Sequence, residues 1–314
     1  MTKQFLADVL SDLGQFPKRL SSKYFYDETG DKLFQQIMNC DEYYPTDCEL
    51  EIFKNRTAEL AVAINKGSTA FDLIELGAGD ATKSGFLLST LAEAGTDYTY
   101  IPIDISGSMI DFLEQSLPER IPGLKVTGLN GDYFDMLGQA YTLSSRRKVI
   151  LFLGGNLGNM PVPEAYEFCK KLHASMQPGD LLLLGFDLKK NPHIIRAAYN
   201  DKEGLTRDFN LNLLKRINRE LDGDFDVTQF QHYPSYDPAT GSCKSYLISL
   251  ADQEVKISGT AFSFERDEFI DMEISQKYSI IETDHMAAQS GFAPVRHFLD
   301  SRKWFLDTIW EVIQ

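Results

Sequence analysis

The chain has 314 residues and carries 46 acidic against 31 basic residues, which gives a formal net charge of −15 at pH 7. This length accommodates about two domains of ~150 residues each, and a composition of 43% hydrophobic and 25% charged residues excludes a globally disordered chain. The acidic excess argues against nucleic acid and against an anionic membrane surface as partners, because both attract positively charged proteins.

The N-terminal segment, residues 1–13, has acidic residues inside its apolar pattern, so we expect an amphipathic helix there rather than a signal peptide. The sequence contains no run of roughly 18 uncharged apolar residues, which a membrane helix would require. The four cysteines form no C-x-x-C pair and the five histidines are dispersed, so we expect no metal site. Together these features favour a reduced, cytoplasmic setting.

Residues 1–51 are predicted to form helices joined by a loop rich in aromatic residues, and from residue 71 onwards short apolar runs alternate with helical patterns. The apolar runs are continuous, as in strands that are buried on both faces of a parallel sheet. The predicted strands are 71–76, 98–105, 124–132, 148–154 and 180–188, and the predicted helices between them are 83–95, 106–123 and 163–180. This alternation predicts a doubly wound α/β sheet.

The segment 189–276 departs from this alternation: it begins with helical patterns and continues with alternating strands around the turn DPATG. After it, the helix DHMAAQSG and the strands FAPVRHFLD and KWFLDTIWEVI are expected to return to the sheet. We therefore expect an α/β domain interrupted by a second, α+β domain. The first consists of 52–188 plus 277–314, and the second of 1–51 plus 189–276.

The strongest local motif is Glu75-Leu-Gly77-Ala-Gly79-Asp80, at the end of the first predicted strand. Glycines at this point allow a sharp turn and let a ligand lie against bare backbone. A dinucleotide fingerprint, G-x-G-x-x-G, would require a third glycine where this chain has Thr82. The motif therefore favours a loop that binds S-adenosylmethionine (SAM) over the nucleotide site of an oxidoreductase, with Gly77 and Gly79 as cofactor-binding residues.

Two aspartates follow the next two predicted strands. Asp104 can accept hydrogen bonds from both hydroxyls of a ribose, and Asp132, beside Tyr133, can accept one from the amino group of an adenine. An isolated aspartate after a strand is also common as a turn or helix-cap residue. Because the carboxyl ends of parallel strands meet at one edge of the sheet, the loop and the two aspartates together predict a single cofactor crevice.

Several longer motifs follow one another in a fixed order, among them KYFYDETG, DEYYPTDCELEIF, ELGAGDATKS, PIDISGSM, LFLGGNLGNM and MEISQKY. In these motifs, and over nearly its whole length, the chain resembles the histidine-specific SAM-dependent methyltransferases, a family whose members include enzymes that make trimethylhistidine (hercynine) in ergothioneine biosynthesis. The resemblance implies a Rossmann-like class I methyltransferase sheet with an inserted α+β substrate-binding domain. It also implies an enzyme, expected to be monomeric, that methylates the α-amino group of a free amino acid, with L-histidine as the expected substrate.

The same resemblance implies roles for individual residues. Tyr26 matches a catalytic tyrosine that lies near both the sulfonium of the cofactor and the amine of the substrate. Tyr43 matches a wall of the amino-acid pocket. Asn159 and Tyr199 match the pair that binds the substrate carboxylate, and Glu273 and Ser275 match the residues that face the imidazole. The residues that match the family's SAM site are Gly77, Lys83, Asp104, Asp132, Tyr133 and Gly154.

The residues themselves leave other roles open. Glu273 and Ser275 are two positions apart, so in a strand both point to the same face, where a carboxylate and a hydroxyl can bind two nitrogens of one imidazole. An exposed strand face would carry the same residue types. The remaining candidates are equally compatible with a left-handed turn, for Asn159, and with aromatic packing, for Tyr26, Tyr43 and Tyr199.

The chain departs from the family pattern in the segment KSYL, where histidine-specific members carry a methionine against the imidazole and this chain has Ser245. Ser245 is smaller and polar, so we include it among the substrate-binding residues while the identity of the substrate side chain stays open. The alternatives are another aromatic or modified amino acid, such as a tryptophan derivative or a thiolated histidine, and a SAM-binding protein without catalysis.

Overall fold

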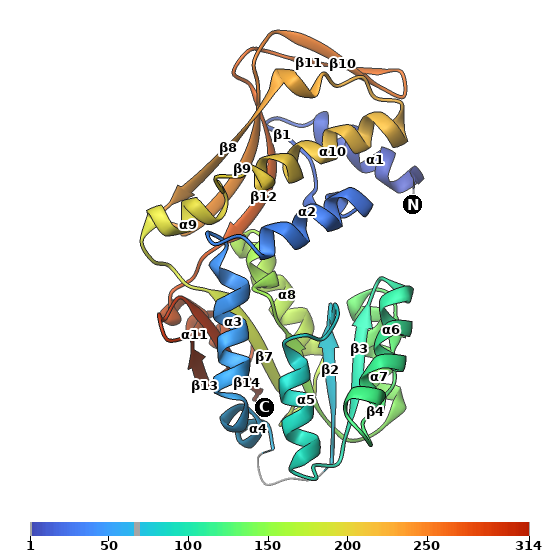
Figure 1. The fold of residues 1–314 in the computed structure, drawn as a ribbon, viewed down its shortest axis with the longest axis vertical. Coiled ribbons are helices and arrows are strands. Elements are labelled where there is room, and N and C mark those ends of the chain that lie inside the picture. The colour runs from blue at the N-terminus through green and yellow to red at the C-terminus, as the bar shows by residue number, and fades with distance from the viewer. Residues whose placement is uncertain (1, 66–69, 314) are drawn as a thin grey trace. The chain divides into compact units, whose positions relative to one another are not determined.

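The computed structural model describes residues 2–65 and 70–313, and the chain separates into two compact units (Figure 1). We call Pro45–Lys189 with Lys277–Gln314 the sheet unit, and Met1–Tyr44 with Lys190–Gln276 the insert unit. The division expected from the sequence differs from this one at residues 45–51 and at Lys189. Residues 45–51 fall in the sheet unit because they belong to one continuous helix, α3 (Tyr44–Asn55).

The sheet unit is built on an eight-stranded sheet whose strands run in the order β13-β14-β7-β6-β2-β3-β4, with β5 also paired to β3. Strands β2 to β7 are parallel to one another, and β14 is antiparallel to both of its neighbours. This is the Rossmann-like class I methyltransferase sheet that the resemblance implied. The strands are β2 (Phe71–Leu76), β3 (Tyr98–Asp104), β4 (Lys125–Val126), β5 (Leu129–Asn130), β6 (Arg147–Phe152), β7 (Leu181–Asp187), β13 (Phe292–Leu299) and β14 (Phe305–Val312).

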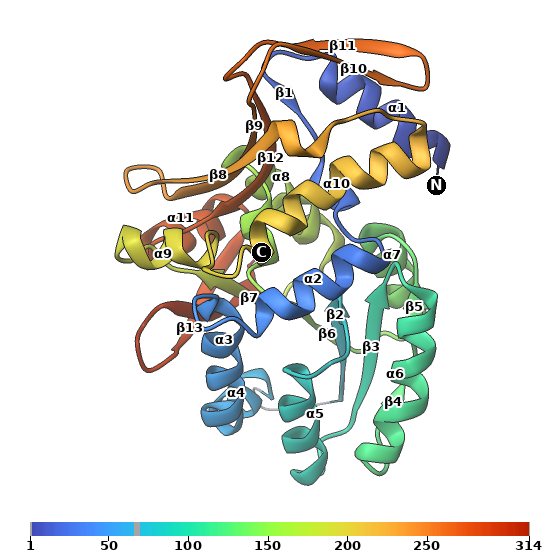
Figure 2. The ribbon, with the colours of Figure 1, turned by 45° about the horizontal axis from the view of Figure 1, so that its top comes forward.

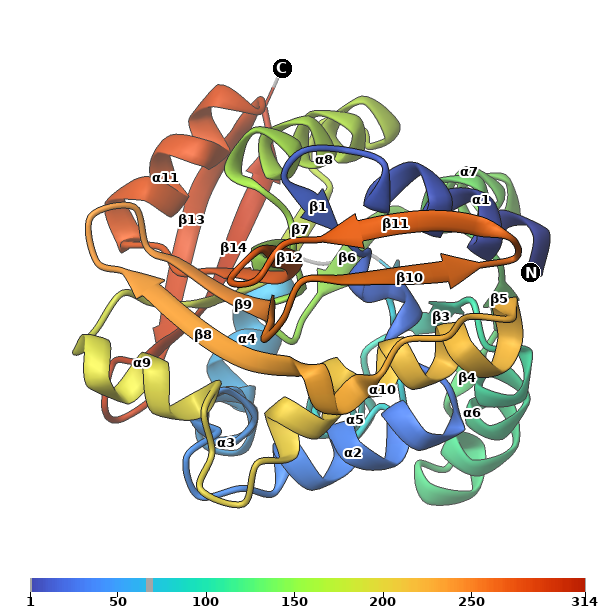
Figure 3. The ribbon, with the colours of Figure 1, turned by 90° about the horizontal axis from the view of Figure 1, so that it is seen from above.

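Helices cover both faces of this sheet. Seen from above, α3, α5 and α6 lie on one side of it and α7, α8 and α11 on the other (Figure 3). Strands β2 and β7 are buried along their whole length, as expected for strands covered on both faces, and in β2 this burial includes Asp72 and Glu75. The helices of this unit are α3, α4 (Thr57–Ile64), α5 (Ser84–Glu93), α6 (Gly107–Arg120), α7 (Tyr133–Leu143), α8 (Val162–Ser175) and α11 (Ile280–Gln289), with the 3-10 turn η2 (Asn156–Asn159).

The sequence analysis missed helix α7 and joined two short strands into one. The segment predicted as the strand 124–132 forms β4 and β5, because Thr127 and Gly128 separate the two pairs that bond to β3. Helix α7 begins directly after this segment, where the Asp132 side chain accepts from the Phe134 amide and caps its first turn.

The chain leaves the sheet unit and returns to it at one place. Leu188 forms a parallel bridge with Tyr278, and the Lys189 amide donates to the Tyr278 carbonyl at 2.8 Å. Beside them, the buried side chains of Lys277 and Asp187 form an ion pair at 2.7 Å. The segment 190–276 is therefore an insertion whose two ends are tied together by the sheet unit itself.

The insert unit contains a four-stranded sheet in the order β1-β12-β9-β8 and a separate hairpin, β10-β11. Helix α2 packs alongside α10 (Figure 2), and both contribute to an apolar core shared with the four-stranded sheet. The β8–β9 turn is the predicted one, with Asp237 opposite Ser242. The elements are α1 (Thr2–Leu13), β1 (Lys18–Arg19), η1 (Ser22–Tyr24), α2 (Glu28–Met38), α9 (Pro192–Ala198), α10 (Leu205–Leu221), η3 (Val227–Gln229), β8 (Phe230–Asp237), β9 (Ser242–Ser249), β10 (Gln253–Ile257), β11 (Thr260–Phe264) and β12 (Phe269–Gln276).

Within residues 2–65 and 70–313, no helix combines the length and the apolar character that a membrane span requires.

Candidate active site

The glycine loop after β2 has the backbone geometry that the sequence predicted. Gly77 and Gly79 adopt positive φ angles of 69° and 51°. A Cβ atom at Gly77 would lie 2.7 Å from the hydroxyl of Tyr133, whereas one at Gly79 would meet no atom within 4 Å. The loop therefore needs glycine for its turn, and at Gly79 it exposes backbone that a ligand can approach.

Asp104, at the end of β3, lies against this loop. One carboxylate oxygen accepts from the Ser106 amide at 2.9 Å and the other from the Gly79 amide at 3.4 Å. A carboxylate offers about four acceptor positions, so these two bonds leave capacity for ligand hydroxyls. The structure thus gives Asp104 a structural role in the loop and also the free acceptor capacity that a ribose would use.

Asp132 and Tyr133 lie at the start of α7. One oxygen of Asp132 caps the helix by accepting from the Phe134 amide at 2.9 Å, which is the structural alternative that the sequence left open. Burial, then the nearby carboxylates of Asp104 and Asp132, raises the pKa of Tyr133 above its usual value. The structure therefore brings Gly77, Asp104, Asp132 and Tyr133 together at one edge of the sheet.

Lys83 and Gly154 also lie close together, through a residue that the sequence analysis missed. The Lys83 ammonium pairs with the carboxylate of Glu49, a residue of α3, and the Gly154 amide donates to the same carboxylate at 2.7 Å. Glu49 lies within the motif DEYYPTDCELEIF, but its local pattern gave no reason to choose it among the acidic residues of a helix.

Asn159 is the last residue of the 3-10 turn η2, in the sheet unit. Its φ angle is not positive, so Asn159 does not adopt the left-handed geometry that was one alternative for it. Its expected partner Tyr199 belongs to the insert unit, and their joint role as the carboxylate-binding pair stays a prediction.

In the insert unit, aromatic side chains form a continuous chain of ring contacts. Tyr26 contacts Phe34 and Phe209, with ring centroids 5.6 Å apart in each case, and the chain continues from Phe34 to Tyr43 and from Tyr43 to Tyr199. Packing, the alternative role for these tyrosines, is thus present. The sequence analysis did not select Phe34 or Phe209, because ordinary apolar periodicity explains both.

A β-bulge decides where Glu273 and Ser275 point. The pairing of β12 with β9 shifts between Asp271 and Glu273, so that Glu273 lies opposite Ser245 and Ser275 opposite Cys243. Ser245 and Cys243 belong to the buried row of β9, and residues paired across two strands share a face. Glu273 and Ser275 therefore face the interior side of the sheet and not the exposed side.

Hydrogen bonds connect this row to its surroundings. The Tyr199 hydroxyl, at the end of α9, donates to the Ser275 hydroxyl at 2.7 Å. On the neighbouring strand, Ser245 is only 1% exposed and its hydroxyl lies 3.2 Å from the imidazole of His232. Burial lowers the pKa of His232 to about 4, so its imidazole is neutral near pH 7. His232 is a second residue that the sequence analysis missed.

Tyr26 belongs to the same group of side chains. Its side chain is 46% exposed. Partial removal of water by the surrounding side chains, followed by the negative charges of Glu273 and Asp31, raises the pKa of its phenol above the usual value. The insert unit thus gathers Tyr26, the expected catalytic residue, with Glu273 and the Tyr199–Ser275 pair, which are expected substrate residues. Among the residues that the structure describes, no group of three or more histidine, cysteine, aspartate or glutamate side chains could hold a metal ion.

Below the glycine loop, Glu75 is a fully buried acid that should make folding stability depend on pH. Burial raises its pKa from 4.5 to about 7, against the opposing hydrogen bond from Tyr100 at 2.5 Å. A raised pKa means that the folded state favours the neutral carboxyl. The contribution of Glu75 to folding stability is therefore fully present below about pH 4.5, where the carboxyl is protonated in both states, and is lost as the pH rises through about 7.

We therefore expect the Glu75→Gln protein, which cannot ionise, to lose less stability than the wild type between about pH 5 and about pH 8. The rise in the pKa of Glu75 from 4.5 to about 7 corresponds to roughly 3 kcal/mol in the free energy of unfolding. Urea unfolding at a series of pH values measures the difference. Stability curves that run parallel for the two proteins would show that Glu75 does not titrate in this range.

Comparisons with known proteins identify the family of this chain. The family described as histidine-specific methyltransferase, SAM-dependent, matches residues 5–312. A Mycobacterium tuberculosis protein named histidine N-alpha-methyltransferase is 35% identical over 296 residues, which cover 93% of this chain and 90% of the relative. The ergothioneine biosynthesis protein 1 of Neurospora crassa is 30% identical, over 89% of this chain and 32% of that protein. An L-tryptophan methyltransferase of Psilocybe serbica is 28% identical, over 96% and 91% of the two chains.

The family match spans nearly the whole chain, and the first of these relatives is matched along nine-tenths of its length. The sheet order, the glycine loop and the aspartates after the first strands are those expected of a SAM-dependent enzyme. This chain belongs to the family of histidine-specific, SAM-dependent methyltransferases.

Proposed function

We propose that the protein transfers methyl groups from SAM to the α-amino group of L-histidine, with trimethylhistidine as the final product. The observation that carries the substrate side of this proposal is the β-bulge that turns Glu273 and Ser275 to one interior face. A carboxylate and a hydroxyl on the same face can bind the two nitrogens of one imidazole and fix its tautomer. The relative named histidine N-alpha-methyltransferase supports the same substrate.

The sheet unit has the groups that SAM requires. The backbone at Gly79 offers a surface without side chains, and Asp104 has acceptor capacity for ribose hydroxyls. We assign the adenine to Asp132 and Tyr133, at the start of α7. Lys83 and Gly154 complete the proposed site. SAM supplies a methyl group that its sulfonium already activates, so the protein has mainly to position the amine for in-line attack.

The insert unit would present the substrate amine in its neutral form. Tyr26 retains its phenolic proton because its pKa is raised, so we assign it the positioning of the amine rather than the role of a strong base. Before each transfer the ammonium loses one proton to water; in the transfer a nitrogen–carbon bond forms and the sulfur–carbon bond of SAM breaks, so that three transfers release three protons in all. The aromatic faces of Tyr26 and Tyr43 would favour the growing positive charge of the methylated ammonium.

A second candidate substrate is a larger aromatic or modified amino acid. The observation that favours it is Ser245, a small side chain whose hydroxyl is already bound to His232. In the proposed site, a serine in place of methionine would leave more room beside the substrate ring. The relative named L-tryptophan methyltransferase, at 28% identity, is consistent with such a variation within the family.

Incubating the protein with SAM and a panel of free amino acids, and reading product masses, tests both candidates. The panel holds L-histidine, L-tryptophan and a thiolated histidine. We expect L-histidine to gain successive methyl groups on its α-nitrogen, located by fragmentation. Nα-acetylhistidine is the matched control and should stay unmodified. Methylation on the imidazole, or of the larger substrates in preference to histidine, would contradict the histidine assignment. An absence of methyl transfer to every substrate would contradict an enzymatic role.

A further inference from the structure

Glu49 is a buried acid that connects two loops of the sheet unit. Its side chain is only 1% exposed, one oxygen pairs with the Lys83 ammonium, and the other accepts from the Gly154 amide at 2.7 Å. Lys83 follows the glycine loop after β2, and Gly154 follows β6. A single side chain from α3 therefore holds both loops.

The position of this carboxylate depends on the absence of a side chain in β7. A Cβ atom at Gly185 would collide with the Glu49 carboxylate, because the two groups occupy the same space above the sheet. Glycine within a strand often marks such a close approach. The missing side chain at Gly185 thus leaves the space that the Glu49 carboxylate occupies. An ion pair on the protein surface would not need such a space.

Two acidic side chains, Glu49 and Asp307, lie near the single ammonium of Lys83. Burial by itself would lower the pKa of Lys83, but the charge of Glu49 and the hydrogen bond to it, together with smaller contributions from Asp307 and Glu75, outweigh burial and raise the net pKa, so Lys83 keeps its charge. Asp307 of β14 lies nearby. Burial, followed by the charge of Glu49, raises its pKa well above the usual value and favours its neutral form. Glu49 is therefore the carboxylate that balances Lys83.

The two loops lie at the point where the order in which the chain adds strands to the sheet reverses. Strands β2 and β6 are neighbours, and the chain continues from β2 toward β3 on one side and from β6 toward β7 on the other. In sheets of this kind ligands bind outside the carboxyl ends of the strands at such a point. Lys83 and Gly154 flank it, and Glu49 fixes their separation.

We propose that Glu49 is a positioning residue for SAM binding: it holds the Lys83 ammonium and the Gly154 peptide at fixed places on either side of the crevice between β2 and β6. This proposal rests on the cofactor site given under Proposed function. Glu49 acts through Lys83 and Gly154, and its effect on binding should therefore depend on Lys83.

Calorimetric titration of SAM into wild type, Glu49→Gln, Lys83→Met and the double variant tests this dependence. Glu49→Gln keeps the size of the side chain and removes its charge. We expect it to weaken SAM binding about tenfold in the wild-type background and less than about twofold in the Lys83→Met background. Equal losses in both backgrounds would overturn the proposal.

Asp72→Asn is the matched control. Asp72 forms another buried carboxylate–lysine pair of this unit, with Lys148 at 2.6 Å, near the amino end of β2. We expect it to lower the melting temperature while SAM affinity stays within about twofold of wild type. An equal loss of affinity in Asp72→Asn and Glu49→Gln would show a general effect of destabilisation and would overturn the proposal.

A second variant and the SAM affinity of the wild type complete the test. If the Glu49→Gln protein does not fold, Gly185→Ala displaces the carboxylate without changing any charge, and a folded Gly185→Ala protein with unchanged SAM affinity would overturn the proposal. A wild-type protein that binds no SAM contradicts the proposed cofactor site itself. Wild-type binding that Glu49→Gln leaves unaltered contradicts only the role of Glu49.

Discussion

Replacing Glu273 with alanine is expected to lower kcat/KM for L-histidine by roughly ten- to a hundredfold. A hydrogen bond to a charged group contributes about 1.5–3 kcal/mol, and in the proposed site Glu273 makes such a bond with the imidazole. The loss should be specific to the substrate, because Glu273 lies in the insert unit and the proposed cofactor residues Gly77, Asp104 and Asp132 lie in the sheet unit. Steady-state kinetics, together with calorimetric SAM titration, measures both effects.

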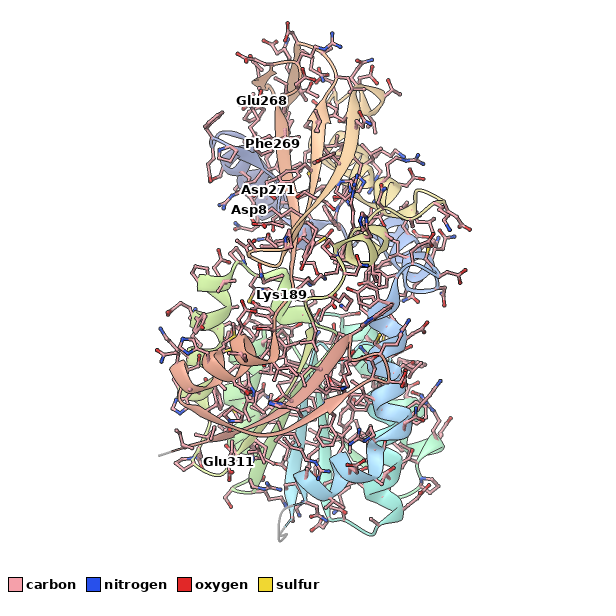
Figure 4. The ribbon with its side chains drawn as sticks, turned by 90° about the vertical axis from the view of Figure 1, so that its left-hand side faces the viewer. Asp8, Lys189, Glu268, Phe269, Asp271 and Glu311 are labelled. Carbon is pink, nitrogen blue, oxygen red and sulfur yellow. The ribbon has the colours of Figure 1, made fainter. Side chains whose placement is uncertain are left out.

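The same strand provides a matched control. Asp271, labelled with Phe269 in Figure 4, precedes the bulge, pairs with Tyr246 on the opposite face and forms an ion pair with Lys244 at 2.5 Å. Asp271→Ala removes an acid of similar exposure from the other side of β12, and we expect kcat/KM for histidine to change less than about threefold, since surface ion pairs contribute little. Equal losses in the two variants would remove Glu273 from the substrate site.

Replacing Asp104 with alanine is expected to weaken SAM binding by about ten- to a hundredfold. The carboxylate would lose its bonds to the ribose hydroxyls, and the glycine loop would lose the bond between the Gly79 amide and Asp104. Titration calorimetry measures the affinity for SAM and for its demethylated product, and both should fall, because both carry the ribose.

Asp97→Ala is the control for this second experiment. Asp97 immediately precedes β3 at its opposite end and forms an exposed ion pair with Arg146 at 3.1 Å. SAM affinity should stay within about twofold of wild type in this variant. Full SAM affinity in the Asp104→Ala protein would mean that the cofactor crevice has been placed at the wrong strand end.

The parallel core of the sheet could be predicted because the central strands are mainly apolar runs, interrupted in β2 by Asp72 and Glu75, and glycine, proline or charged residues separate them from their neighbours. The glycine loop and Asp104 followed from the same pattern, since both are fixed by where a strand ends. Helix α7 was missed because it starts without a loop of its own, directly after Gly131 and Asp132. The sequence predicts helices and strands best where several turn-forming residues, such as glycine and proline, separate them.

The remaining site residues depend on contacts that are distant in the sequence. Glu49 and Gly154 are 105 positions apart, and Ser245 and His232 meet only because β8 and β9 pair in one particular register. Spacing correctly placed Glu273 and Ser275 on one face, but it could not say which face. The alternation of Ile270, Met272 and Ile274 would by itself turn Glu273 outward, and only the bulge reverses this.

The tied ends of segment 190–276 have a consequence for how this protein can change over time. Leu188 and Tyr278 are bonded neighbours, so the strand order of the sheet unit does not depend on the length or content of the chain between them. We therefore expect the sheet to tolerate changes in the length of that segment. If the segment carries substrate recognition, as we propose, selection can alter the preferred amino acid while the machinery for binding SAM is inherited unchanged.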